Sequence, residues 1–409
     1  MRFRKSIPSA SIIIFLVLTL ALLAAPARCA NDEAPIKAAS FESDWQAFTA
    51  EIDGSYPFFE LKQIAADWIK CKEELGRKIK TCRTEAEFLA VVADAIRVLR
   101  DAHMGFTETK TPLPKSPPEY YPGIAFAPAT EKRVVVLAGP PNNKELACGV
   151  VVRQIDKKPA RDVLEEKAAA AWKEGGCFSS PQRARLFEYR LALRGKKGDA
   201  HTLTIETARG TKEVKVSCDT VARGWPHTYN MPAGLTQSGP VAYGPLASGV
   251  GYIYLRYVDV QTEAGIAKAL GAHPDSKGWL IDLRGNGGGG YDAKLVDRMG
   301  SIPKPVAVLI DAGCISAGET LARDFVQTTS ARLFGETSAG ASSAKKSWVF
   351  PSGRATLTLP TRSRVGLNRR PIEFYGIVPD EEAEAVPQEL RSGKNSGILR
   401  AEEWLLKQR

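Results

Sequence analysis

Residues 279–290 read WLIDLRGNGGGG, an apolar run that leads into a charged and glycine-rich turn. Residues 306–319 read VAVLIDAGCISAGE and repeat this order of a short apolar run, a turn with glycine and a helix-forming segment. Strand-like runs that alternate with helical segments are typical of a layered α/β core. We therefore expect strands at 250–255, 279–283 and 306–310, with helices at 262–270, 291–299 and 316–327.

The sequence before this core predicts two further parts. Residues 41–103 carry apolar residues at helical spacing, and Thr84 followed by acidic residues fits a helix N-cap. Prolines between 112 and 118 form a linker. Residues 120–220 then alternate β-rich runs with two helical stretches, which indicates a separate small module. We expect domain boundaries of 28–110 for the helical region, 118–222 for the module and 223–409 for the core.

The first 27 residues have the order of a secretory signal peptide. Three basic residues precede an apolar stretch from residue 12 to residue 25, and a small-x-small cleavage site follows at Ala25-Pro26-Ala27. The apolar stretch is short for a membrane span. We expect cleavage after residue 27, export to the periplasm or the extracellular space, and no membrane span in the mature chain. An uncleaved anchor is the alternative.

The formal net charge is +10, from 56 Lys and Arg against 46 Asp and Glu. The basic residues are dispersed among acidic ones, apart from a run at Arg362, Arg364, Arg369 and Arg370. Such a distribution is typical of an ordinary soluble surface rather than a nucleic-acid site, so we expect no nucleic-acid partner.

The seven cysteines could form disulfides in an exported chain. Cys71 and Cys82 flank a connection between two expected helices and are the best candidates for a pair. Cys314 lies in an apolar segment and is expected to be a buried free thiol. The remaining spacings fit no zinc pattern, and we expect neither a metal nor a cofactor.

The glycine-rich turn allows two interpretations. Gly285, Gly287 and Gly290 satisfy G-x-G-x-x-G after a strand, and Asp311 ends the next strand about 20 residues on, as in a dinucleotide site. However, a segment so dense in glycine matches many patterns by chance. Arg284 also stands where a dinucleotide site has a small apolar residue. We therefore favour a catalytic turn.

Ser316 also has two interpretations. Residues 316–319 fit the S-x-x-E capping box, so the serine could simply cap a helix. A serine at a strand-to-helix turn can instead act as a nucleophile, because N–H groups at the helix N-terminus stabilise an oxyanion. Ala317 would supply one donor, and Gly287 or Gly288 the second, since glycine permits close approach of the backbone. A nucleophilic serine needs a base, and the residues alone do not choose among the four histidines.

Taken together, these motifs resemble the serine peptidase family that includes the carboxyl-terminal processing peptidases, the tricorn core and interphotoreceptor retinoid-binding protein. Residues 282–289 resemble its D-x-R-G-N-x-G-G turn, and residues 316–319 resemble its nucleophile motif. Residues 335–340 and 376–380 resemble two later signatures. The resemblance covers nearly all of the mature chain, with the motifs in the family's order.

The resemblance implies that Ser316 is the nucleophile and His103 its base. Ala341 stands where the processing peptidases have their catalytic lysine, whereas Asp101-Ala102-His103 matches the D-x-H element of the tricorn-like branch. The resemblance also implies that Glu373 orients His103. Tricorn has a serine where this chain has Ala102.

For the fold, the resemblance implies a crotonase-like ββα superhelix core with an N-terminal helical region and an inserted PDZ-like module. Gly123, Ile124 and Phe126 would belong to the carboxylate-binding loop of that module, because PDZ domains hold a peptide C-terminus with backbone N–H groups. The alternative is a PDZ remnant that only packs against the core.

The function implied is that of an exported serine peptidase. Its substrates would be unfolded or C-terminally exposed polypeptides, cleaved by Ser-His-Glu acyl-enzyme catalysis. The alternative is a non-catalytic protein on the same fold that binds a peptide or an apolar ligand.

Overall fold

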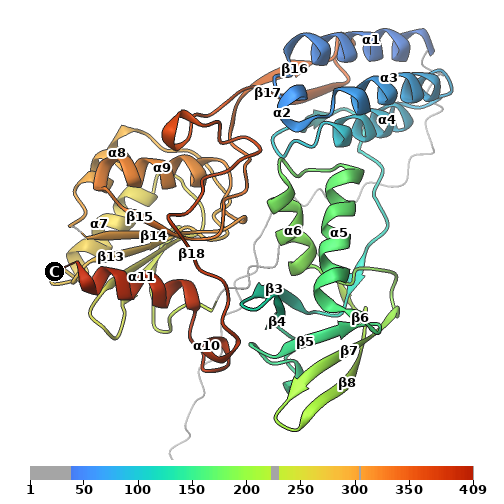
Figure 1. Cartoon of the computed structure of the whole chain (residues 1–409). Coiled ribbons are helices and arrows are strands. Elements are labelled where there is room, and N and C mark those ends of the chain that lie inside the picture. Colours follow the sequence, from blue (N-terminus) through green and yellow to red (C-terminus); the bar gives the residue numbers. More distant parts are fainter. Residues whose placement is uncertain (1–37, 223–229, 304, 409) are drawn as a thin grey trace, which may run out of the picture.

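The structure, a computed structural model, describes residues 38–222, 230–303 and 305–408. The expected signal peptide at 1–27 lies outside these residues. Figure 1 shows three parts: a helical region, a small α/β module and a larger core with helices on both faces of a sheet. Within the described residues, none of the helices has the length and apolar character needed to cross a membrane.

The core is built on a seven-stranded sheet of order β10-β11-β12-β13-β14-β15-β18. Strands β12 to β15 and then β18 are parallel and follow one another in chain order, while β10, β11 and β12 are antiparallel. The bounds are β10 Thr236–Ser238, β11 Val241–Pro245, β12 Gly251–Leu255, β13 Trp279–Asp282, β14 Val306–Ile310, β15 Arg332–Gly335 and β18 Glu381–Glu382. The core strands expected from the sequence are therefore confirmed.

Helices cover both faces of this sheet (Figure 1). On one face Ile253, Ile281 and Val308 join a hydrophobic cluster with the connecting helices, and on the other Leu280 and Leu309 pack against the C-terminal helix. Burial of both faces explains why the strands read as continuous apolar runs. The helices are α7 Thr262–Ala272, α8 Ala293–Gly300, α9 Ala317–Thr329, α10 Pro387–Arg391 and α11 Ser396–Lys407.

The N-terminal helices share their hydrophobic core with a hairpin that belongs to the C-terminal part of the chain. Phe350 and Leu357 of this hairpin pack with Phe48, Trp68 and Phe88 of the helical region. The helices are α1 Ala38–Ser55, α2 Phe59–Lys62, α3 Ala65–Ile79 and α4 Glu85–Val98, and the three-stranded sheet β1-β17-β16 consists of β1 Gly105–Thr109, β16 Ser343–Val349 and β17 Ala355–Ser363. The expected N-cap at Thr84 is present as a complete capping box.

The module has its own hydrophobic cluster, and the short strands β2 (Tyr120–Tyr121) and β9 (Thr220–Val221) pair at its entrance and exit. Its sheet has the order β3-β4-β5-β7-β8, with β6 paired to β5. Both expected helices and all the expected β-rich runs are present. The bounds are β3 Ala125–Ala129, β4 Arg133–Ala138, β5 Val151–Ile155, β6 Lys158–Pro159, α5 Ala160–Glu174, α6 Pro181–Arg190, β7 Ala200–Thr207 and β8 Gly210–Ser217.

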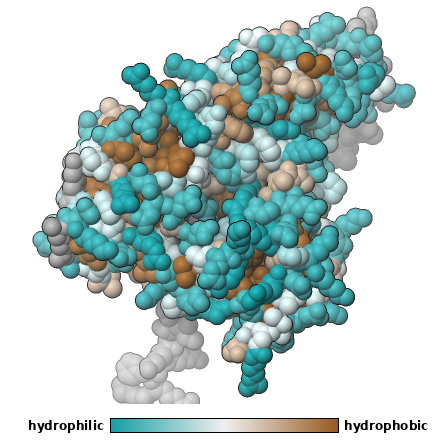
Figure 2. All heavy atoms as spheres, in the orientation of Figure 1, coloured by the Kyte–Doolittle hydropathy of each residue, from teal (hydrophilic) through white to brown (hydrophobic). Residues whose placement is uncertain are grey.

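The expected pairing of Cys71 with Cys82 is wrong, because both are buried free thiols. Cys314 is a buried free thiol, as expected, and burial raises its pKa well above the ordinary value. The face of the molecule in Figure 2 is mainly hydrophilic, with separated hydrophobic patches.

Candidate active site

Ser316 lies at the sharp turn between β14 and α9, with φ 59° and ψ −119°. Such a backbone conformation is unfavourable for a residue with a side chain and persists only where neighbouring contacts impose it. The Ser316 N–H donates to the carbonyl of Ala341 at 3.0 Å and to the carboxylate of Glu319 at 3.2 Å. The same carboxylate accepts from Ser338 Oγ at 2.6 Å and from the N–H of Gly340 at 2.7 Å. Glu319 thereby fixes the turn that presents Ser316.

Glu319 is fully buried, and burial raises its pKa to about 7 although its hydrogen bonds act in the opposite direction. Because Glu319 accepts from the backbone N–H of Ser316, the carboxylate half of the expected capping box is formed. The hydroxyl of Ser316, however, has another partner: its Oγ lies 3.0 Å from Nε2 of His103. The two residues are 213 positions apart in the chain, so only the tertiary structure brings them together.

His103 lies in the turn between α4 and β1, and Asp101 Oδ1 accepts from its backbone N–H at 2.9 Å. Burial lowers the pKa of His103 to about 4; the positive charges of Lys345 and Lys62 act in the same direction and Asp101 opposes them. The imidazole is therefore neutral at pH 7 and can accept the proton of Ser316. Its second nitrogen, Nδ1, is buried and has no hydrogen-bond partner among the described residues.

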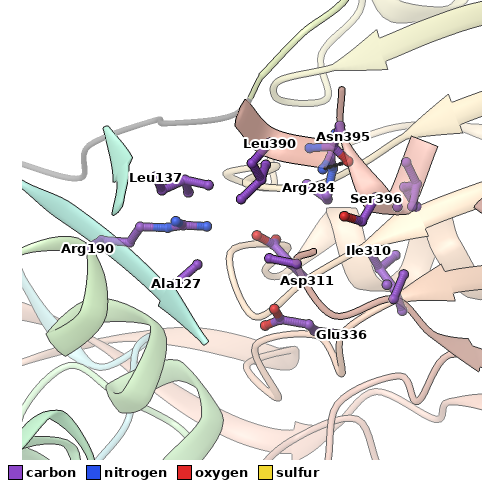
Figure 3. Close-up of a pocket in the computed structure, with 15 residues that line it drawn as sticks. Ala127, Leu137, Arg190, Arg284, Ile310, Asp311, Glu336, Leu390, Asn395 and Ser396 are labelled. Carbon is purple, nitrogen blue, oxygen red and sulfur yellow. Dashed lines mark hydrogen bonds between the residues drawn. The ribbon is translucent and has the colours of Figure 1, made fainter. Parts of the chain in front are cut away.

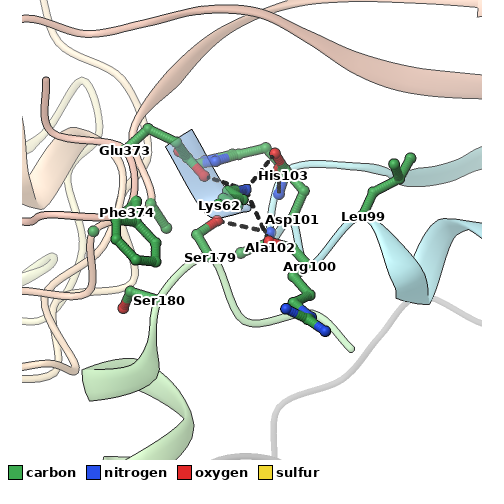
Figure 4. Close-up of polar contacts among 12 residues, drawn as sticks. Lys62, Leu99, Arg100, Asp101, Ala102, His103, Ser179, Ser180, Glu373 and Phe374 are labelled. Atoms are coloured by element: carbon green, nitrogen blue, oxygen red, sulfur yellow. Dashed lines mark hydrogen bonds and ion pairs between the residues drawn. The ribbon is translucent and has the colours of Figure 1, made fainter. Parts of the chain in front are cut away.

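Lys62, at the end of α2, is fully buried beneath this turn. Its ammonium donates to the carbonyl of Arg100 at 2.8 Å and to Tyr56 Oη at 3.1 Å. It forms ion pairs with Asp101 at 3.1 Å and with Glu373 at 2.9 Å. Figure 4 shows it between the two carboxylates. Lys62 thus ties the segment that carries His103 to the loop that carries Glu373.

Glu373 reaches the site, but its hydrogen bond and ion pair are with Ser342 and Lys62 rather than with His103. Its carboxylate pairs with Lys62 and accepts from the N–H of Ser342 at 3.1 Å. Burial and the nearby charge of Asp101 raise its pKa to about 8. In the described part of the chain, no hydrogen bond joins Glu373 to His103. A residue that orients the imidazole directly would make such a bond, so Glu373 does not orient His103 by direct contact here.

Ser179 also enters the site, from the segment between α5 and α6. Its Oγ accepts from the N–H of Ala102 at 3.0 Å (Figure 4), and Ser179 acts against the raised pKa of Glu373. A hydroxyl therefore lies beside Ala102, although the serine comes from the module and not from the histidine's own turn.

The glycine-rich turn packs directly against the nucleophile. A Cβ on Gly288 would lie 2.7 Å from Cβ of Ser316, and Gly288 has φ +81°, so only glycine fits. Its N–H already donates to Asn286 Oδ1 at 2.9 Å, and that of Gly287 donates to the carbonyl of Arg256 at 2.9 Å. The expectation that Gly287 or Gly288 supplies a free oxyanion donor is therefore wrong in this conformation.

Two other N–H groups near Ser316 are available. Ala317 is the first residue of α9, where an N–H has no acceptor within its own helix. Gly289 forms a parallel bridge with Val258. In this bridge the N–H of Val258 donates to the carbonyl of Gly288, and the N–H of Gly290 donates to the carbonyl of Val258. The N–H of Gly289 therefore points away from Val258.

The predicted peptide-binding residues of the module are mostly internal. The side chains of Ile124 and Phe126 are fully buried in the module's hydrophobic cluster, so with Gly123 they could contact a peptide only through the backbone. A cavity of about 200 Å³ lies beside Phe126, between α6 and the loop at 335–337. A smaller one adjoins it, and there Arg190 extends from the module toward Asp311 and Glu336 of the core (Figure 3). Neither cavity is lined by Ser316 or His103.

Sequence reasoning did not identify Lys62 or Ser179. Lys62 stands in a segment rich in aromatic residues, where a lone lysine is usually exposed. Ser179 and Ser180 precede a proline and read as a helix cap, which Ser180 indeed is. No pattern in the sequence distinguishes the neighbouring Ser179.

Comparison with known proteins relates part of the chain to one peptidase family. The model of peptidase family S41 matches residues 291–383, a range that includes Ser316 and Glu373 but not His103. A carboxyl-terminal-processing protease of Synechocystis sp. is 27% identical over 269 residues, which cover 56% of this chain and 61% of the relative. The chain thus matches less than two thirds of the length of that curated relative.

Solved structures show the same overall fold. Mature CPAF in complex with lactacystin has a TM-score of 0.60 at 14% identity, covering 90% of this chain and 98% of that chain. A putative peptidase from Parabacteroides merdae has a TM-score of 0.51 at 14% identity, covering 90% and 97%. At such identity the likeness concerns the fold alone. The chain is therefore similar to the S41 serine peptidases in residues 291–383, and its overall fold is similar to that of the two solved proteins.

Proposed function

We propose that this protein is an exported serine peptidase that cleaves unfolded or C-terminally exposed polypeptides. The observation that carries the proposal is the 3.0 Å contact between Ser316 Oγ and His103 Nε2 at the N-terminus of α9. A hydroxyl beside a neutral imidazole, at the end of a helix with free N–H groups, is the arrangement that acyl transfer requires.

In the proposed reaction, Ser316 Oγ attacks the peptide carbonyl carbon while His103 Nε2 takes the hydroxyl proton. The N–H groups of Ala317 and Gly289 donate to the resulting oxyanion. His103 then returns the proton to the leaving amine, which departs with the C-terminal part of the substrate. Water, activated by the same imidazole, hydrolyses the acyl-enzyme.

Glu373 acts in this scheme through the network around it. With Lys62 and Ser179 it holds the Asp101–His103 turn in place. A water molecule or a small rotation of the ring would link Nδ1 of His103 to this network. Ser316, His103 and Glu373 form the catalytic set in this scheme.

The remaining expectations are also proposals. The chain-order winding of β12 to β15 supports a crotonase-like core, and the strand order with α6 beside β3 supports a PDZ-like module. The basic and apolar N-terminal segment supports export. The second candidate function, a non-catalytic binding protein, is favoured by the unpartnered Nδ1 of His103.

Labelling with a serine-directed phosphonate distinguishes these two functions. The mature protein should be labelled, whereas Ser316→Ala should not react, and His103→Ala should react about 10²–10⁴-fold more slowly. Both variants should retain the circular dichroism spectrum of the wild type. A folded wild-type protein that neither reacts nor hydrolyses any peptide, but binds one stably, would favour the binding protein.

A further inference from the structure

Two basic residues beside the active site lack an acidic partner. Lys345 in β16 and Arg364 just after β17 are exposed, and their side chains form no ion pair or hydrogen bond within the described residues. The next residue, Lys346, pairs with Glu51 at 2.6 Å. The two lysines are adjacent in the chain, yet only Lys346 has an acidic partner. The position of each side chain in the fold, rather than the local sequence, therefore leaves Lys345 unpaired.

The alternation of side chains along β16 explains the contrast. Lys346, Trp348 and Phe350 alternate on one side of the strand; Lys346 pairs with α1, and the two aromatic residues join the core of the helical region. Lys345 is offset by one residue and therefore lies on the opposite face. Exposed Val349 shares that face.

Arg364 and Lys345 are tied closely to the nucleophile through the backbone. The N–H of Arg364 donates to the carbonyl of Ser342 at 2.8 Å, and Ser342 Oγ donates to the carbonyl of Ser316 at 3.2 Å. Lys345 lies three residues after Ser342, in β16, which begins at Ser343. Both positive side chains therefore start from backbone beside Ser316.

The charges around His103 are unbalanced. Lys345 is the charged group that most strongly lowers the pKa of His103, and Lys62 adds to this effect. Asp101, the acid that opposes them, is already paired with Lys62. Burial and the charge of Asp101 raise the pKa of Glu373, the second acid at Lys62, which favours its neutral form. Burial and then the charge of Arg364 lower the pKa of Lys345, while Asp101 acts in the opposite direction. The site is thus positive on the side of Lys345.

We propose that Lys345 and Arg364 form a receptor for a carboxylate of the substrate, so that the peptidase prefers peptides with an acidic group beside the cleaved bond. This inference rests on the proposed peptidase function. The carboxylate belongs either to an Asp or Glu side chain or to a free C-terminus. Binding would relieve the repulsion between the two basic groups through charge-assisted hydrogen bonds. It would also make His103 a stronger base, because it neutralises the nearest positive charge.

The test uses the full mature chain and three fluorogenic peptide series of matched sequence. In the first series, Gln is placed in turn at each of the two residues before and the two residues after the cleaved bond. The C-terminus of these peptides is amidated. The second series has Glu in place of Gln, and the third has Gln with a free C-terminal carboxylate. We expect kcat/KM to rise about 10–100-fold in the second series at one position, or in the third, which identifies the source of the carboxylate. The acid limb of the kcat profile should move to higher pH with the preferred peptide.

Variants assign the preference to particular residues. Lys345→Gln and Arg364→Gln should each reduce the ratio of kcat/KM between acidic and neutral peptides toward 1, whereas Lys346→Gln should preserve it. Equal cleavage of all three series by the wild type, or an acidic preference that survives in the double variant Lys345→Gln/Arg364→Gln, would overturn the proposal and leave the peptidase function intact. Absence of both turnover and phosphonate labelling would instead overturn the peptidase function, and this proposal with it.

Discussion

At the scale of single residues, the site depends on close backbone approach. Ser316 is held at φ 59° by Ala341 and Glu319, and Gly288 packs against its Cβ. Both positions are left-handed, and the geometry tolerates no larger residue at 288. Because the loop and the nucleophile share this contact, a change at Gly288 affects catalysis and stability together.

Replacement of Gly288 by Ala should therefore lower both properties. The new Cβ would meet Ser316 at 2.7 Å and the carbonyl of Ile315 at 3.0 Å, at a φ of +81°. We expect phosphonate labelling to slow by at least about 10²-fold, because the displaced loop would move the N–H of Gly289 away from the oxyanion. The free energy of unfolding should fall by about 1–3 kcal/mol. Gly290→Ala is the matched control, because its Cβ would meet no atom within 4 Å. Equal labelling of both variants would contradict the placement of this loop.

At the scale of elements, the four-residue helix α2 supplies the buried cation of the active-site network. It ends in Lys62, whose side chain lies between Asp101 and Glu373. Two buried carboxylates from different parts of the chain therefore depend on one cation. The segment before α6 adds Ser179 to the same network.

Replacement of Lys62 by Met should be strongly destabilising. The change keeps a long unbranched side chain but leaves two buried acids without their cation, at a cost of about 3–5 kcal/mol in the free energy of unfolding. Labelling of Ser316 should also slow in the folded fraction, because Asp101 anchors the turn that carries His103. Lys72→Met removes a half-exposed pair with Asp53 and should cost less than about 1 kcal/mol. Similar denaturation midpoints for the two variants would show that the buried network is not important.

At the scale of the whole molecule, stability and pH are linked through the junction of the parts. Glu373 of the core contacts Lys62 of the helical region and Ser179 of the module, and its pKa is raised to about 8 by burial. The folded protein therefore keeps a proton that the unfolded chain releases above about 4.5. The stability contributed by this group is present at pH values below 4.5 and is lost as the pH rises toward 8.

Glu373→Gln tests this linkage, because the amide stays neutral at all these pH values. The difference in unfolding free energy, wild type minus variant, should be lower at pH 8 than at pH 5 by at least about 1.4 kcal/mol, the equivalent of one pKa unit. Urea denaturation at both pH values measures it. The exposed change Glu73→Gln should show no such pH dependence. A difference for Glu373→Gln that is constant, or that increases with pH, would disprove the raised pKa.

Much of the fold follows from local sequence. The apolar runs at 279–283 and 306–310 form β13 and β14, and the expected helices begin and end within a few residues of α7, α8 and α9. Ser316 also follows from sequence, since its position between a strand and a helix is a local property. The division of the chain into parts could not be predicted in the same way. The hairpin β16–β17 completes the hydrophobic core of the N-terminal helices, and the hydrophobic periodicity of a segment does not indicate which distant segment it packs against.

The sequence by itself determined the alternation of strands and helices, the glycine turn and the serine that it faces, because these depend on residues close together in the chain. The sequence named His103 only through its family resemblance, and the tertiary structure shows the contact of His103 with Ser316. Only the tertiary structure decided which cation pairs with Asp101 and Glu373, and which N–H groups stay free for an oxyanion. These contacts join residues tens to hundreds of positions apart. Their energies come from burial and charge pairing, which exist only after the separate parts have packed together.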